Sequence, residues 1–257
     1  MFNAYKPGLK FQLTRDYLTN RKNFRFVLKD TVRSYRINRK LTGMIKIYGR
    51  KSSSNVQVVM WCIAELGLDY QRLDAGIHYG VVNTASYLAI NPNATVPTII
   101  DGDYPPMWES AAINRYLSRT YPHETLWPDS PLQQAIVDQW AEWAKLNFGL
   151  NFSVPVFWQV VRTPRNKQNP EALAIALKKL HRQMSIADTQ LGNNPFIAGN
   201  EFSIADLMFG HLLYRYYDIE IERPHFNNIS RYYATLTNRP AYREHVMVSY
   251  DELRASD

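Results

Sequence analysis

Apolar and polar residues first fall into a regular pattern near the middle of the first hundred residues. Residues 44–48 alternate as in a half-buried β-strand. Apolar residues then recur at helical spacing over 56–66, and the pattern stops at Gly67, a residue type common just after a helix. Residues 70–74 predict a second strand. A strand, a helix and a strand within about thirty residues indicate a βαβ unit with parallel strands.

A second group of elements follows a loop that contains Gly and Asn. The turn 91–97 (Asn-Pro-Asn-Ala-Thr-Val-Pro) leads into a predicted strand at 98–101. The Asp-Gly pair at its end is typical of a hairpin turn, and 107–109 is expected to be the returning strand. Ser110 is expected to cap the next helix. The order βαβ followed by ββα is the thioredoxin-like arrangement.

The second half of the chain has a helical pattern and no convincing strand. A linker with several prolines, residues 123–131, separates it from the first half. Helices are expected at 132–150, 171–191 and 204–217. Strands followed by helices predict two packed domains. We therefore expect an α/β thioredoxin-like N-terminal domain at 44–123 and an all-α C-terminal helical bundle domain at 132–257.

The first 43 residues differ from the rest in charge. They hold eleven Lys and Arg against two Asp, a net charge of +9, whereas the whole chain carries +7 and its remainder −2. The basic excess therefore gives no support for nucleic-acid binding by the main body. We expect 1–43 to be an extension that the fold does not need, either absent from the native protein or disordered. Recruitment of an anionic surface by this extension is the alternative.

Cysteine and histidine usage excludes several chemistries. The single cysteine, Cys62, allows no internal disulfide and no CxxC pattern, which favours a reducing, cytoplasmic location. Cys62 lies within the first predicted helix and is expected to be a buried, inert thiol. The six histidines form no metal-ligand spacing, so we expect no metal. No apolar run reaches the roughly 18 residues of a membrane span, so no membrane association is expected.

Four short motifs occur in a characteristic order. They are Ser53-Ser-Asn55 before the first helix, Asn91-Pro with Val96-Pro97, Trp108-Glu109-Ser110, and Phe202-Ser-Ile-Ala-Asp206. Each motif is weak alone, but their order and spacing resemble those of cytosolic glutathione transferases over residues 44–245. The serine-containing loop is similar to the site of bacterial members with a nu- or theta-like serine site. The resemblance implies an enzyme with glutathione as co-substrate.

The resemblance assigns the thiol site to the loop before the first helix. Serine-type members carry the working hydroxyl about fourteen residues before the first-helix glycine, which identifies Ser53. Asn55 matches the Asn that contacts the sulfur in nu-class and related families, so Ser53 and Asn55 are the expected catalytic pair. Ser52 and Ser54 leave the register open and are expected to contact glutathione. The same residues are also suited to capping the helix.

The other glutathione contacts follow from the remaining motifs. Val96-Pro97 resembles the family's cis-proline turn, where the Val96 backbone pairs with the cysteinyl unit of glutathione. Glu109 is expected to take the ammonium group and Ser110 the γ-glutamyl carboxylate at a helix N-terminus. Alternatively, Val96-Pro97 is an ordinary strand start. Ser110 can also be a simple cap and Glu109 an acid that complements the helix dipole, and this interpretation is compatible with glutathione binding.

Two further features belong to the helical half. Trp140, Trp143 and Phe148 are expected to line a hydrophobic substrate pocket, although most aromatic residues at helical spacing are core residues. Ser203 and Asp206 have the spacing of a capping box, which is architectural.

Three functions remain open at this point. The first is conjugation of the glutathione thiolate to hydrophobic electrophiles, that is, detoxification. The second is glutathione-dependent reduction of disulfides or peroxides at the same site. The third is a non-catalytic relative that binds a ligand or a partner, a reading that the intact motif set disfavours. The resemblance also implies a homodimer.

Overall fold

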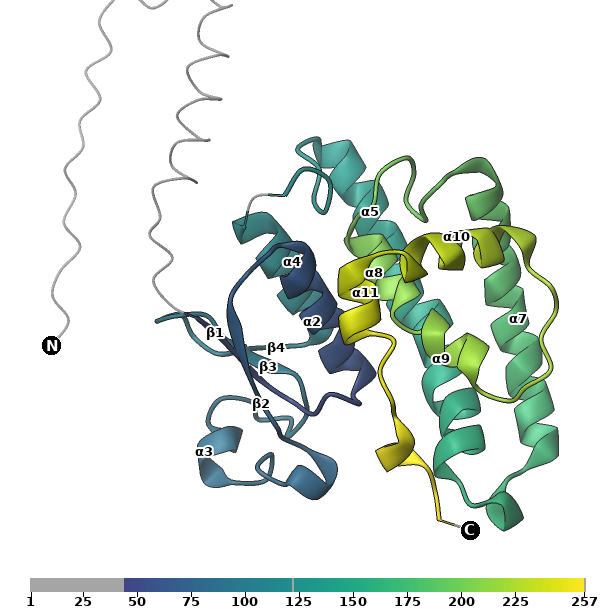
Figure 1. Ribbon diagram of the computed structural model, residues 1–257, viewed down its shortest axis with the longest axis horizontal. Helices are drawn as coiled ribbons and strands as arrows, with labels where there is room; N and C mark the ends of the chain where they lie inside the picture. Colours follow the sequence, from purple (N-terminus) through teal and green to yellow (C-terminus); the bar gives the residue numbers. More distant parts are fainter. Residues whose placement is uncertain (1–43, 122, 257) are drawn as a thin grey trace, which may run out of the picture. The chain divides into compact units, whose positions relative to one another are not determined.

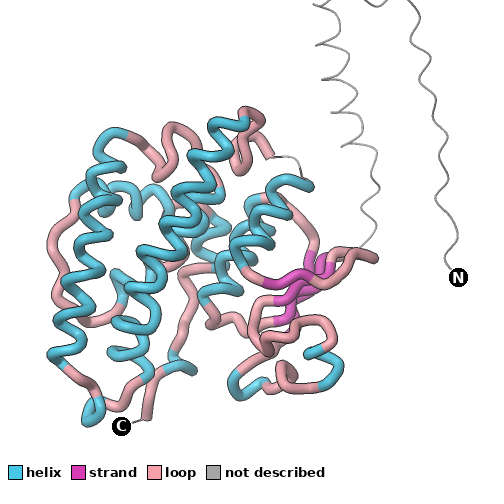
Figure 2. Tube along the Cα trace, turned by 180° about the vertical axis from the view of Figure 1, so that it is seen from behind, coloured by secondary structure: helices cyan, strands magenta, loops and turns pink. Residues whose placement is uncertain are grey.

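The computed structural model describes residues 44–121 and 123–256. The basic extension, residues 1–43, lies outside the described residues. The described chain has a sheet region, residues 44–121, and a helical region, residues 123–256 (Figure 1). Seen from behind, the strands gather in one place and the other described residues form helices and connecting loops (Figure 2).

The sheet has four strands in the order β2-β1-β3-β4. The strands are β1 (Ile45–Tyr48), β2 (Tyr70–Leu73), β3 (Thr98–Ile100) and β4 (Met107–Trp108). β1 pairs with β2 in parallel and with β3 antiparallel, and β3 pairs with β4 antiparallel. The thioredoxin-like arrangement expected from the alternating pattern is confirmed.

Two helices of the sheet region pack against each other, α2 (Ser54–Glu65) and α4 (Ser110–Thr120). They lie between the sheet and the helical region, whereas α3 (Ala85–Leu88) lies away from the helical region (Figure 1). α2 ends as expected, because Gly67 has a φ of 62° just beyond it. Gly49 follows β1, and a Cβ there would lie 2.4 Å from Val56 Cγ2. Glycine at position 49 therefore lets β1 approach the start of α2 closely.

The helical region consists of helices joined by turns and loops. They are α5 (Pro131–Trp143), η3 (Ala144–Gly149), α6 (Leu150–Phe152), η4 (Ser153–Arg162), α7 (Pro170–Asn193), α8 (Ile204–Gly210), α9 (Leu213–Asp218), α10 (Asn227–Thr237) and α11 (Pro240–His245). Single 3-10 turns occupy Ile77–Tyr79 (η2), Arg165–Lys167 (η5) and Asp251–Leu253 (η6). The all-helical second region expected from the pattern is confirmed.

Two helix boundaries differ from the expectation. The helical path that begins with α5 does not end at residue 150 but continues to Arg162, because η3 and η4 are π-helical and accommodate Pro155 without a break. The expected single helix at 204–217 is divided into α8 and α9 at residues 211–212. Both differences arise where local geometry departs from the regular α-helix that residue spacing assumes.

The two regions share an apolar interface centred on α2. Trp61 has no exposed surface and packs against Phe202 and Tyr242, with ring centroids 5.7 Å and 4.7 Å away. Beside it, Arg239 donates to both carboxylate oxygens of Glu65, at 2.8 Å and 2.6 Å. The helical region therefore holds α2, and with it the loop before α2, in a fixed position.

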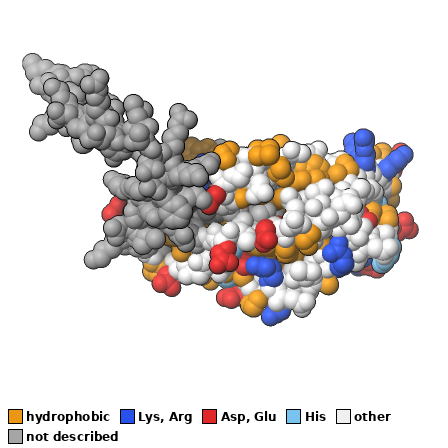
Figure 3. Space-filling model, turned by 90° about the horizontal axis from the view of Figure 1, so that it is seen from above, with side chains coloured by type: hydrophobic (Ala, Val, Ile, Leu, Met, Phe, Trp, Pro, Cys, Tyr) orange, Lys and Arg blue, Asp and Glu red, His pale blue; other side chains and the backbone are white. Residues whose placement is uncertain are grey.

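Cys62 is buried in the same helix, and burial raises the pKa of its thiol. The prediction of a buried cysteine is confirmed. Among the described residues, no helix is long and apolar enough to cross a membrane. On the face shown in Figure 3, acidic and basic side chains are interspersed with hydrophobic ones, and neither charge sign forms a continuous patch there.

Candidate functional site

The loop between β1 and α2 carries the three serines singled out from the sequence. Ser52 and Ser53 are buried, with 2% and 7% of their surface exposed, whereas Ser54 is half-buried and Asn55 is exposed. Ser53 occupies the N-cap position of α2 with an extended backbone, yet its side chain forms no capping hydrogen bond there. The expected capping bond from a serine hydroxyl is absent from α2. The Ser53 hydroxyl therefore lies at the helix N-terminus and accepts no hydrogen bond from the backbone N–H groups of the first turn.

Ser52 has a different environment from Ser53. Its hydroxyl donates to the carboxylate of Glu252, which belongs to the C-terminal segment. Its backbone carbonyl accepts a hydrogen bond from Arg215 of α9, at 2.5 Å. Ser52 is therefore tied to two distant parts of the helical region, and its hydroxyl already has an acceptor.

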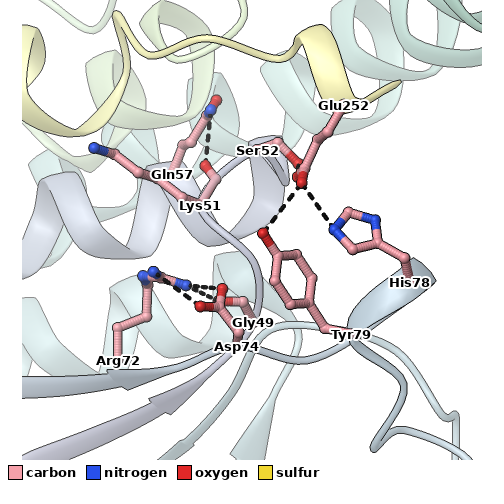
Figure 4. A network of polar contacts seen from close by, with 9 residues as sticks. All are labelled: Gly49, Lys51, Ser52, Gln57, Arg72, Asp74, His78, Tyr79 and Glu252. Carbon is pink, nitrogen blue, oxygen red and sulfur yellow. Dashed lines mark hydrogen bonds and ion pairs between the residues drawn. The ribbon is translucent and has the colours of Figure 1, made fainter. Parts of the chain in front are cut away.

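The Glu252 carboxylate is the centre of a polar network (Figure 4). Besides the Ser52 hydroxyl, it accepts a hydrogen bond from the Tyr79 hydroxyl at 3.2 Å and lies 3.2 Å from the His78 Nε2. These contacts join the C-terminal segment to the serine-containing loop and to the η2 turn. Neither Glu252 nor Arg215 was singled out from the sequence.

The N-termini of α2 and α4 lie next to each other. The Ser110 hydroxyl, at the start of α4, donates to Asn55 Oδ1 at 3.3 Å, so it does not cap α4 as expected. Ser110 is buried, and Glu109 before it has a φ of 70°. Because both helices present unpaired N–H groups and a positive partial charge here, this junction favours anionic groups.

Glu109 already has a cationic partner. Its carboxylate accepts a hydrogen bond from Lys145 Nζ of η3, at 2.8 Å. Both side chains are substantially exposed, so the pair contributes little to stability. Lys145 links the Glu109-Ser110 motif to the helical region and was not identified from the sequence.

The turn that contains Val96 and Pro97 lies beside the start of the serine-containing loop. The Val96–Pro97 peptide bond is cis, and the Val96 Cβ lies 3.3 Å from the position that a Cβ on Gly49 would take. The Tyr87 hydroxyl and the Asn91 amide donate to the Thr95 carbonyl, at 2.7 Å and 2.9 Å. The expected cis bond is confirmed, and buried side chains hold the turn in position.

The three aromatic residues expected to line a hydrophobic pocket fall into two groups. Trp140 and Trp143 line an open cavity of about 310 Å³ on α5 and η3. Phe148 has no exposed surface and packs against Phe152 and Phe209. The structure thus puts Phe148 in the core rather than on a pocket wall, because it lies on the inner face of the helical path.

Among the described residues, no group of three or more His, Cys, Asp or Glu side chains is arranged to hold a metal ion. The capping box expected in the helical region is confirmed: Ser203 and Asp206 bond reciprocally at the start of α8. Asp206 is fully buried, which raises the pKa of its carboxyl to about 6. Its role is to hold the fold rather than to contact a substrate.

Comparisons with known proteins agree on one family. The family model described as "Glutathione S-transferase, N-terminal domain" matches residues 44–119, and "Glutathione S-transferase, C-terminal domain" matches residues 151–240. Glutathione S-transferase GstB of Escherichia coli K12 is 32% identical over 206 residues, which cover 80% of this chain and 99% of GstB. Glutathione S-transferase 3 of Zea mays is 32% identical over 166 residues, 63% of this chain and 73% of the maize protein.

A solved structure supports the same assignment. The theta class glutathione S-transferase of Xanthomonas axonopodis pv. citri, with glutathione bound, superimposes with a TM-score of 0.76 and 37% sequence identity. The match covers 80% of this chain and 98% of the Xanthomonas chain. With both regions matched, in the order that the fold requires, the chain belongs to the glutathione S-transferase family and is an enzyme of that family.

Proposed function

We propose that this enzyme conjugates the thiolate of glutathione to hydrophobic electrophiles, with Ser53 donating a hydrogen bond to the sulfur. The observation that carries the proposal is the position of Ser53 at the N-terminus of α2, where its hydroxyl makes no capping bond. A hydroxyl donor and a helix N-terminus both favour the charged form of a thiol. Ser52 is the weaker candidate, because its hydroxyl already donates to Glu252.

The rest of glutathione is assigned to the neighbouring motifs. The γ-glutamyl carboxylate would accept from the N–H groups at the start of α4 and from the Ser110 hydroxyl, which would turn from Asn55 Oδ1 to this charged acceptor. Glu109 would bind the ammonium group with its carboxylate, which now accepts from Lys145; the ammonium group would either displace Lys145 or share the carboxylate with it. The Val96 backbone would pair with the cysteinyl unit, next to the start of the serine-containing loop. Asn55 contacts Ser110 and so connects the thiol end of the site with the γ-glutamyl end.

The chemistry requires no covalent enzyme intermediate. The thiol of free glutathione has a pKa of about 8.5, so only a small fraction is thiolate at neutral pH. Stabilising the thiolate raises that fraction, and the site then holds it close to the electrophile. The sulfur forms a bond to the electrophilic carbon as the leaving group departs with its electron pair. An aryl chloride, for example, would yield the thioether and chloride.

Glutathione binding and a substrate panel test this proposal together. Ser110→Ala removes a hydrogen bond to a charged group, worth about 1.5–3 kcal/mol, so glutathione affinity should fall roughly ten- to a hundredfold. Ser118→Ala, a buried serine further along α4, is the matched control and should leave affinity unchanged. Turnover is then measured with aryl halides, disulfides and hydroperoxides. Unchanged affinity in the Ser110 variant, or turnover with disulfides or hydroperoxides alone, would contradict the proposal.

We also propose that the enzyme is a homodimer. Exposed apolar side chains lie four residues apart in two groups along the path from α5 to η4, one at 132 and 136 and one from 146 to 158, and exposed apolar patches mark contact surfaces between proteins. They are Leu132, Ile136, Leu146, Leu150, Val154 and Trp158. Light scattering that gives the mass of one chain at micromolar concentration would contradict a homodimer. A reducing, cytoplasmic location is proposed on the basis of the lone buried Cys62.

A further inference from the structure

Three arginines lie close to the serine-containing loop: Arg50 at its start, Arg162 at the end of η4 and Arg215 of α9. Arg215 has 4% of its surface exposed, donates to the Ser52 carbonyl and to Gln57 Oε1, and keeps its Nε without a hydrogen-bond partner. Its burial lowers the pKa of its guanidinium to about 10, with further lowering by the charges of Arg50 and Arg162. A buried guanidinium without a paired carboxylate is unusual, because its desolvation is costly.

Arg50 is also an arginine with a buried, unpartnered Nε, but its side chain is only half-buried. Its Nε is buried without a partner, and its Nη1 lies 3.2 Å from the position that a Cβ on Gly76 would take. Burial lowers the pKa of Arg50, Arg162 lowers it further, and the carboxylate of Glu252 raises it. None of these three arginines forms an ion pair with a described carboxylate.

Glu252 is the carboxylate that faces this cluster. Its oxygens accept hydrogen bonds from the hydroxyls of Ser52 and Tyr79 (Figure 4). Ser52 directly precedes Ser53 in the sequence, so Glu252 lies near the proposed thiol site. The C-terminal segment that carries it is anchored independently, since Ala255 donates to the Val161 carbonyl at 2.9 Å. The Glu252 side chain can therefore leave the cluster while the segment stays in place.

Aromatic rings surround the same cluster. Arg215 lies over the rings of Phe157 and Tyr250, at 4.8 Å and 5.4 Å, and Arg162 lies over Trp158 at 4.3 Å. The region therefore combines aromatic rings with four arginines, Arg254 over Tyr250 included, against three carboxylates: Glu252, Asp218, which accepts from Tyr250, and Asp251, which pairs with Arg254. An aromatic molecule with one negative group matches both properties.

We propose that the second substrate of this enzyme is an aromatic electrophile that carries an anionic group, such as a carboxylate, and that this group replaces the Glu252 carboxylate beside Ser52, His78, Tyr79 and Arg50, with Arg162 as the neighbouring positive charge. The inference rests on the proposed function and narrows its substrate class. The anionic group would hold the ring so that the reacting carbon faces the sulfur at Ser53. The reaction itself is the substitution already described, thioether formation with loss of the leaving group.

A matched pair of aryl chlorides tests the proposal. 4-Chloro-3-nitrobenzoate and 4-chloro-3-nitrobenzamide have the same leaving group and similar shape, but only the first is charged. Their kcat/KM values, each divided by the uncatalysed rate constant with glutathione, give a selectivity ratio. We expect the full chain to favour the benzoate by about tenfold or more, the effect of one hydrogen bond to a charged group.

Variants identify the groups responsible. Arg162→Gln should lower the benzoate-to-benzamide ratio about tenfold, Arg162→Lys should retain most of it, and Glu252→Gln should raise it by removing the competing carboxylate. Arg165→Gln, which removes an exposed positive charge three residues further on, is the matched control and should not change the ratio. Equal loss with both substrates in Arg162→Gln would show that the arginines only support the C-terminal segment. A rise in the KM for glutathione with both substrates would assign them to a carboxylate of glutathione, and either result overturns the proposal.

Binding without turnover separates this inference from the proposed function. Isothermal titration calorimetry of the full chain with unreactive 3-nitrobenzoate and 3-nitrobenzamide measures binding without conjugation. If the benzoate binds at least about tenfold more tightly than the benzamide, and Arg162→Gln removes this difference, the anionic site is supported even if neither aryl chloride is turned over. Equal binding of both compounds, or binding of neither, overturns it even if conjugation is observed.

Discussion

Replacement of Asp206 by alanine should destabilise the protein far more than the loss of a surface helix cap. The buried carboxylate accepts hydrogen bonds from the Ile197 N–H at 3.0 Å, the Ser203 N–H at 2.8 Å and the Tyr232 hydroxyl at 2.8 Å. Asp206→Ala leaves these three buried donors without an acceptor. Each unpaired donor costs about 1–3 kcal/mol, and water that enters the new space recovers part of the cost, so we expect a loss of about 4 kcal/mol.

Urea unfolding, followed by tryptophan fluorescence at pH 7 and a fixed protein concentration, measures this loss. Tyr232→Phe is the graded control, because it removes one donor and leaves the carboxylate with its other partners, so it should cost about 2 kcal/mol. Asp206→Asn keeps the side-chain volume but turns an N–H₂ group toward two donors, so its loss of stability should lie between those of Tyr232→Phe and Asp206→Ala. A loss below about 1.5 kcal/mol in Asp206→Ala would refute the reasoning that these donors remain dry.

Three further variants test other parts of the fold by the same unfolding assay. Glu65→Gln breaks the two-point contact with Arg239 and should cost about 2 kcal/mol, whereas a neutral result would mean that the pair is solvated. Gly210→Ala should cost about 1–3 kcal/mol, since the new Cβ would lie 2.5 Å from Leu236 Cδ1; an unchanged midpoint would show that Leu236 can move aside. Burial lowers the pKa of His211 to about 4, so below about pH 6.5 the unfolded chain takes up a proton at this residue and the folded chain does not. The free energy of unfolding should therefore fall by up to about 3 kcal/mol between pH 6.5 and 4. A constant difference in this free energy between wild type and His211→Gln over the same range would contradict the reasoning.

Much of the sheet region could be predicted because its signals are local. The alternation at 44–48, the helical spacing up to Gly67 and the hairpin after residue 101 each depend on residues within a few positions. The capping box at Ser203 and Asp206 is local in the same way. Such patterns reflect backbone geometry and burial on one face, which neighbouring residues are sufficient to specify.

The helical path from α5 to η4 could not be predicted to its end. Gly149 and Pro155 are residue types that usually end helices, but π-helical geometry carries the chain past both. Phe148 was misassigned for a related reason: this segment has apolar residues on both its inner and outer faces. Spacing alone therefore does not tell which ring is in the core.

The surroundings of the serine-containing loop also lay beyond sequence reasoning. Arg215 and Glu252 reach Ser52 from 163 and 200 residues further along the chain. In the sequence they are ordinary polar residues in helical or terminal segments. The one available signal was an arginine between aromatic residues, Tyr214 and Tyr216, in an otherwise apolar stretch. Only the tertiary packing shows which polar side chains meet.

The pKa of the glutathione thiol bound to the enzyme tests the central claim most directly. Thiolate absorbance in the ultraviolet, recorded against pH at saturating glutathione, gives this pKa for the wild type and for Ser53→Ala, with Ser52→Ala and Ser54→Ala as controls. We expect a value at least about one unit below the 8.5 of a free thiol in the wild type, and a return toward 8.5 in Ser53→Ala alone. A wild-type pKa in Ser53→Ala, together with a raised pKa in either control, would contradict the assignment of Ser53.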